Sequence, residues 1–123
     1  MKTPFDPRHK KRQKLVEDLF RTDFHKQRIR KVAENILTHK DSIDKAIQKA
    51  APQFKIDKIN RIDLAILRLA TFELLIEKRQ PPKVIIDEAI ELAKEYAGDT
   101  SPSFINGALA TLKNEHNENL SKI

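Results

Sequence analysis

Residues 59–107 read INRIDLAILRLATFELLIEKRQPPKVIIDEAIELAKEYAGDTSPSFING, and this stretch decides the fold. It holds two long helical patterns joined by a double proline, followed by a capped third helix that starts at Ser101-Pro102. The first helix begins at a cap on Asn60 or Asp57 and runs to about Lys78. It is apolar on most of its circumference, so it belongs at the centre of a helical domain.

The sequence on both sides of this stretch also follows the helical spacing of three and four residues. Asp6-Pro7 is a suitable start for the first helix, and Pro52 ends the third. The predicted helices cover about 7–20, 24–38, 43–50, 60–78, 83–97 and 101–112. No strand-like alternation occurs, so we expect an all-α protein, a compact bundle of about six to seven helices. One domain over 1–123 is predicted, with flexible ends at 1–6 and 114–123.

The composition excludes several classes of function. The 123 residues include no cysteine, which excludes disulfides, thiolate zinc sites, iron–sulfur clusters and cysteine nucleophiles. The four histidines are scattered and no glycine-rich phosphate loop occurs, so we predict no catalytic residues, no metal, no cofactor and no enzymatic activity. The N-terminus lacks the apolar core of a signal peptide, and no run approaches the roughly 18 apolar residues of a membrane span. A cytoplasmic protein without membrane contact is expected.

Positive charge is concentrated at the start of the chain. The net charge is +6, and residues 1–31 hold eleven Lys/Arg against four Asp/Glu. Arg8, Lys11 and Arg12 share a helix face with the apolar residues that follow, and Lys10 and Lys14 flank it. Because a core cannot accept unpaired charges, this helix is expected to project past the bundle or lie over its rim. Such a cluster suits phosphate groups; the alternative is a solvated basic end without a specific partner.

Two further features allow two interpretations each. Residues 98–104 lead into a helix start, which suits a phosphate, and Phe104 there could stack an unpaired base. The spacing of Phe104 with Ala108 and Leu112 favours a core position instead. On the 83–97 helix, acidic residues form a stripe that is either a solvated face or a docking face for a basic protein. The stripe consists of Asp87, Glu88, Glu91 and Glu95.

The strings ILRLATFELL, PPKVIIDEAIELAKEY and SFINGAL resemble the C-terminal half of the NusB family of transcription antitermination factors. The resemblance covers about residues 54–112, with a weaker match at 8–20. It implies an all-α fold of two small helical subdomains and binding of single-stranded boxA-like RNA beside a NusE-type ribosomal protein. The expected function is therefore an RNA-binding adaptor in antitermination or ribosomal RNA transcription, which reaches the RNA polymerase elongation complex indirectly.

The resemblance also assigns residues. The family's basic patch falls on Arg8, His9, Lys10 and Arg12, and its RNA-contacting aromatic falls on Phe104. With the neighbouring basic and loop residues, the expected RNA-binding set is Arg8, His9, Lys10, Lys11, Arg12, Lys14, Thr100, Ser103 and Phe104. The positions facing the NusE-type protein fall near Phe20 and Asp63.

The chain departs from the family pattern at particular positions. Asp87 stands where the family commonly has Asn, and Ala110 stands where an Asp often follows the NGxL string. The basic patch contains Lys and His as well as Arg. These departures bear on RNA preference and on the NusE partnership, not on the fold. Two alternatives stay open: a stand-alone relative of the RNA-binding domain of ribosomal RNA cytosine methyltransferases, and a non-enzymatic protein-interaction scaffold, including a homodimer.

Overall fold

The computed structural model describes the backbone of residues 6–23 and 29–121, with side chains as far as residue 115. These ranges contain helices and no strand, as the sequence predicts. The α-helices are α1 (Pro7–Thr22), α2 (Lys31–Thr38), α3 (Lys40–Ala50), α4 (Arg61–Phe72), α5 (Pro82–Tyr96) and α6 (Ser101–Ser121). A 3₁₀ turn, η1 (Ile56–Lys58), precedes α4, and a π-helix, η2 (Glu73–Glu77), follows it.

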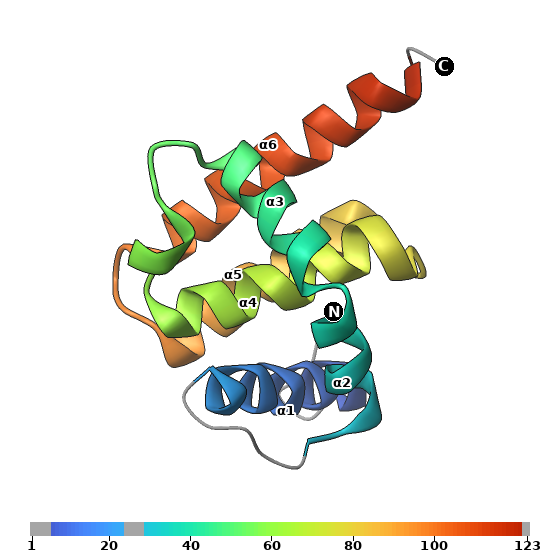
Figure 1. Ribbon diagram of the computed structural model, residues 1–123. Coiled ribbons are helices and arrows are strands. Elements are labelled where there is room, and N and C mark those ends of the chain that lie inside the picture. The colour runs from blue at the N-terminus through green and yellow to red at the C-terminus, as the bar shows by residue number, and fades with distance from the viewer. Residues whose placement is uncertain (1–5, 24–28, 122–123) are drawn as a thin grey trace.

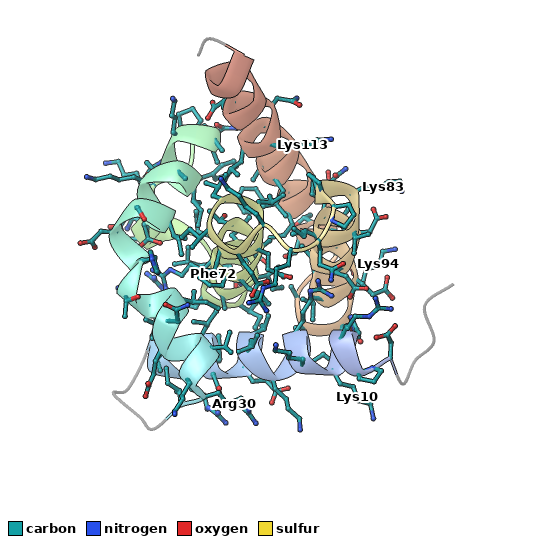
Figure 2. All side chains as sticks on the ribbon, turned by 90° about the vertical axis from the view of Figure 1, so that its right-hand side faces the viewer. Lys10, Arg30, Phe72, Lys83, Lys94 and Lys113 are labelled. Atoms are coloured by element: carbon teal, nitrogen blue, oxygen red, sulfur yellow. The ribbon has the colours of Figure 1, made fainter. Side chains whose placement is uncertain are left out.

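Helix α4 lies at the centre of the bundle. Every residue from Asp63 to Phe72 is buried, and the helix contacts all five other α-helices. In Figure 1, α1 lies on one side of the α4–α5 pair and α6 on the other. Figure 2 shows Phe72 in the interior, whereas Lys83 and Lys94 lie at the periphery. The buried apolar side chains form one continuous cluster, which confirms the central position predicted for this segment.

Local capping chemistry fixes two helix starts. The Asp6 carboxylate accepts a hydrogen bond from the Arg8 amide at 2.9 Å, and Pro7 occupies the first helical position of α1. The Asn60 side chain accepts from the Ile62 amide at 2.9 Å and caps α4. Asp57, the other candidate cap, lies in η1. Asp6 therefore caps α1, as its position before Pro7 predicts.

The second helix starts later than the sequence predicts. Residues 24–28 lie outside the described residues, and α2 begins only at Lys31. Arg30 has an extended backbone (φ −64°, ψ 150°), and its amide donates to the Asp18 carboxylate at 3.2 Å. A tertiary hydrogen bond from α1 thus takes the amide that a longer helix would use.

The predicted helix to Lys78 changes type before it ends. After Phe72 the chain widens into η2, and Lys78 closes it with a left-handed backbone at φ 55°. The Lys78 amide donates to the Glu73 carbonyl at 2.9 Å. Glycine is the usual residue at such a left-handed helix end because it has no Cβ to clash.

The last helix is longer than its apolar pattern. The start at Ser101-Pro102 is confirmed, but α6 continues as helix to Ser121, past Asn114. Figure 1 shows its C-terminal half extending beyond the bundle. None of the helices in the described part is both long and apolar enough to cross a lipid bilayer.

Candidate nucleic-acid interface

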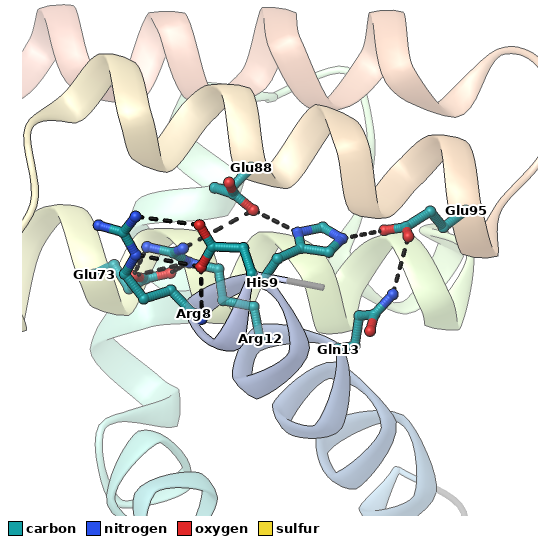
Figure 3. A network of polar contacts seen from close by, with 8 residues as sticks. Arg8, His9, Arg12, Gln13, Glu73, Glu88 and Glu95 are labelled. Carbon is teal, nitrogen blue, oxygen red and sulfur yellow. Dashed lines mark hydrogen bonds and ion pairs between the residues drawn. The ribbon is translucent and has the colours of Figure 1, made fainter. Parts of the chain in front are cut away.

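Helix α1 divides its basic residues between two environments. Arg8, Lys10, Lys11 and Lys14 are exposed, whereas His9 and Arg12 are buried. The division follows the helical period, since His9 and Arg12 lie about one turn apart and face acids of α5 and η2 (Figure 3). The predicted basic residues of α1 therefore fall into two groups, one exposed to solvent and one buried against the bundle.

Arg12 is an interior residue of the bundle. Its Nη2 lies 2.8 Å from Glu73 Oε1 and its Nε lies 3.0 Å from Glu73 Oε2, a two-pronged pairing shown in Figure 3. Its Nη1 lies 3.9 Å from Glu88 Oε2. Burial lowers the pKa of Arg12, but the hydrogen bonds and charges of Glu73 and the charge of Glu88 outweigh burial and raise it. The expectation that α1 must carry this charge past the bundle is wrong for Arg12, because buried acids pair with it.

His9 connects α1 to α5. Its Nδ1 lies 2.5 Å from Glu88 Oε2, and its Nε2 lies 2.6 Å from Glu95 Oε1 (Figure 3). Each ring nitrogen thus faces one carboxylate of α5. Gln13 donates to the second oxygen of Glu95 at 2.9 Å. The side chain of His9 is 5% exposed, so its contacts hold α1 in place.

Two members of the acidic stripe on α5, Glu88 and Glu95, contact α1. The Glu88 side chain is 12% exposed and that of Glu95 is 35% exposed, so the predicted solvated face is wrong for Glu88. Asp87 is exposed and pairs with Lys83 at 3.1 Å, one turn away. For Glu88 and Glu95 the basic partner is a helix of the same chain.

The outward side of α1 keeps a cationic edge. The Arg8 side chain is 72% exposed and contacts the Asp6 carboxylate at 3.1 Å. A cavity of about 160 Å³ lies between α1 and the α4–α5 junction, lined by Arg8 and Lys11 and also by Glu77 and Arg79. Arg79 is a basic residue that sequence reasoning missed, because its segment gave no indication of lying beside α1.

The second group of predicted residues lines one groove. Thr100, Ser103 and Phe104 border a cavity of about 660 Å³ between the start of α6 and the end of α3. Thr100 and Ser103 are exposed, while Phe104 is half-buried and packs against the core cluster. Phe104 is therefore partly a core residue, as its spacing predicts, and partly accessible from the groove. The Ser101 amide is already bound to the Gly98 carbonyl at 3.1 Å.

Phe54 joins this groove from a distant part of the sequence. Its ring centroid lies 5.0 Å from that of Phe104, with the ring planes 72° apart. Phe54 is 45% exposed although it is a large aromatic residue. The available signal in the sequence was an aromatic residue in the segment PQFKIDK, which lies between two predicted helices.

The structure keeps the α1 edge and the Phe104 groove apart. The cavity at α1 and the groove at α6 share no lining residue. Figure 1 shows α1 and α6 on different sides of the α4–α5 pair. A ligand that touches both must therefore extend across the bundle.

The two predicted protein-interface residues also face different neighbours. Phe20 is half-buried against the core cluster. The buried Asp63 carboxylate accepts a hydrogen bond from the Ser101 hydroxyl at 3.1 Å, so it points to α6. Its other oxygen, Oδ1, has no hydrogen-bond partner among the described residues. Burial raises the pKa of Asp63, and the Ser101 hydrogen bond only partly opposes this.

The described residues thus form an all-helical bundle with a cationic helix edge and a separate aromatic groove. The NusB family model matches residues 6–114, and the chain belongs to the NusB family. The transcription antitermination protein NusB of Clostridium novyi (strain NT) is 42% identical over 84 residues. That match covers 68% of this chain and 63% of the relative, so the chain matches less than two thirds of the relative's length.

Solved structures share the fold. A T. maritima NusB structure has 32% sequence identity and a TM-score of 0.78, and the alignment covers 94% of each chain. A second structure, of the antitermination factors NusB and NusE in complex with double-stranded RNA, has 22% identity and a TM-score of 0.76. That alignment covers 89% of this chain and 99% of the other, and at this identity it supports the fold alone.

Proposed function

We propose that this protein is a cytoplasmic RNA-binding adaptor in transcription antitermination or ribosomal RNA transcription. It binds single-stranded boxA-like RNA together with a NusE-type ribosomal protein, and through that complex it acts on the RNA polymerase elongation complex. It works by binding and performs no catalytic step.

The observation that carries the proposal is the exposed edge of α1. Arg8, Lys10, Lys11 and Lys14 gather on one helix whose inner side is held by buried ion pairs. Clustered cations bind RNA phosphates by charge and release counterions, while the fixed helix keeps their spacing constant. Pre-positioned cations lose little conformational freedom when they bind.

The aromatic groove supplies a second kind of contact. Phe104 and the hydroxyls of Thr100 and Ser103 border one cavity, where an unpaired base can stack and form hydrogen bonds. Because the groove and the α1 edge lie apart, a bound single strand runs across the bundle between them. Family membership supports the boxA-like RNA and the NusE-type partner.

Titration of labelled single-stranded RNA, followed by fluorescence anisotropy, tests this function. A boxA-like sequence and a scrambled sequence of equal length are compared, each with and without a NusE-type protein. We expect the boxA-like RNA to bind more tightly and the NusE-type protein to strengthen that binding further. Equal, weak binding of both RNAs with no effect of the protein would refute the adaptor function and favour a protein-only scaffold.

A further inference from the structure

We propose that Phe54 and Phe104 together bind one unpaired base of the RNA, and that Phe54 provides the surface on which the base stacks. This inference rests on the proposed RNA-binding function and adds to it a residue from the α3–α4 connection. The occupant is a base of single-stranded RNA, whose π face matches the exposed ring.

The exposure of Phe54 is the first observation. It is 45% exposed, the highest value among the exposed large hydrophobic side chains of the described residues, where Val84 has 40% and Tyr96 has 36%. Tyr96 has a partner, since its hydroxyl donates to Glu17 at 2.7 Å. Phe54 has no polar group, so its exposed ring contributes nothing to solubility and costs hydration free energy.

The backbone that carries Phe54 is held in place. The Phe54 amide donates to the Ala51 carbonyl at 3.0 Å. Gln48, on α3, donates to the Phe54 carbonyl at 2.7 Å and accepts from the Ile56 amide at 3.0 Å. The Gln48 side chain thus links the backbone at Phe54 and at Ile56 to helix α3. A ring fixed in this way is ready to stack without prior ordering of the loop.

The two rings form a corner. Phe104 packs into the core on one side, and its ring stands at 72° to that of Phe54 with the centroids 5.0 Å apart. A base stacked parallel to one ring is therefore nearly perpendicular to the other, and offset-stacked and edge-to-face arrangements are both favourable for aromatic rings.

The surroundings suit a nucleotide better than an apolar peptide. Both rings line two cavities, of about 660 Å³ and 300 Å³. The larger one carries the hydroxyls of Thr100, Ser103 and Thr111 and the carboxylate of Asp99, which can contact the edge of a base. The smaller one carries Lys58, which can contact the adjoining phosphate. An apolar side chain could use none of these polar groups, whereas a nucleotide can pair with them.

The experiment uses single-stranded boxA-like RNA in which 2-aminopurine replaces each base in turn, because its fluorescence falls when it stacks on an aromatic ring. Wild type, Phe54→Leu and Phe54→Trp are compared, with Val84→Ala as a control for removal of an exposed apolar side chain elsewhere. We expect quenching at one position, loss of that quenching in Phe54→Leu, and an affinity loss of about tenfold or more. Phe54→Trp is expected to keep both.

Two outcomes would overturn the assignment and leave RNA binding intact. In the first, Phe54→Leu keeps wild-type affinity and quenching while the Lys11→Gln, Lys14→Gln variant loses affinity. In the second, Phe54→Leu binds RNA normally but loses affinity for a NusE-type protein. That result would show that the Phe54 surface binds the protein partner and not the RNA. If wild type binds no RNA at all, the proposed function fails as well. Thermal unfolding checks that each variant is folded.

Discussion

Arg12 and Glu73 form a buried ion pair, with Nη2 2.8 Å from Oε1 and Nε 3.0 Å from Oε2. The side chains are 8% and 10% exposed. The pair explains why the inner face of α1 is basic in its first turns and apolar in its later turns. Both the basic part and the apolar part of this face contact the bundle, but they contact different surroundings. The first turns of α1 meet acids from η2 and α5, whereas the later turns meet the apolar core.

Loss of one partner of this pair is expected to destabilise the fold strongly. Arg12→Ala leaves Glu73 buried and unpaired, and we expect the free energy of unfolding to fall by about 3–5 kcal/mol. The double variant Arg12→Met, Glu73→Leu removes both charges and should recover most of the loss. Urea unfolding measures both. If the double variant binds boxA-like RNA as tightly as wild type, Arg12 positions α1 and does not contact the RNA.

The exposed lysines of α1 are expected to affect RNA binding and not stability. Lys11→Gln, Lys14→Gln should weaken binding and lower the salt slope of log K by about 0.7 for each phosphate that the variant no longer neutralises. Its free energy of unfolding should stay within about 0.5 kcal/mol of wild type. The matched control is Lys45→Gln, Lys49→Gln, which removes two lysines from α3. An equal change of slope in the control would show that only net charge matters.

Relief of the left-handed backbone at Lys78 should stabilise the protein. Lys78 has φ 55°, where a Cβ is unfavourable and glycine is not. We expect Lys78→Gly to raise the free energy of unfolding by about 1 kcal/mol, measured by urea unfolding. Lys78→Ala keeps the Cβ and should give no such gain. Equal values for the two variants would mean that the side-chain charge matters here and the backbone does not.

Asp18 should make stability depend on acidic pH. Burial raises the pKa of Asp18, but hydrogen bonds from Arg30 and the charges of Arg30 and Arg21 outweigh burial and lower it. Its contribution is therefore present above the unfolded-state pKa of about 3.9 and is lost as the pH falls toward the lower folded-state pKa. Asp18→Asn should cost about 1–3 kcal/mol at neutral pH, since Arg21 and Arg30 can rehydrate.

The measurement is urea unfolding of wild type and Asp18→Asn between pH 7 and pH 3. The difference in free energy of unfolding between the two proteins should shrink as the pH falls below about 4. A difference that stays constant over this range would mean that the Asp18 charge contributes nothing.

Local chemistry made much of the fold predictable. The apolar circumference of residues 61–72 required a central helix, and the caps at Asp6 and Asn60 and the double proline fixed where helices begin. These signals act within one or two turns, so a single sequence contains them completely. The start of α2 escaped prediction because Arg30 donates its amide to Asp18 on another helix.

Which partner each side chain meets was decided only by the tertiary structure. The sequence alone determined an all-helical chain with a basic start and an aromatic residue at the entry to its last helix. It could not show that Arg12 meets Glu73, that His9 lies between Glu88 and Glu95, or that Phe54 packs on Phe104. Helical periodicity gives the face on which a residue lies, but the packing of distant helices determines whether that face meets water, an acid or another ring.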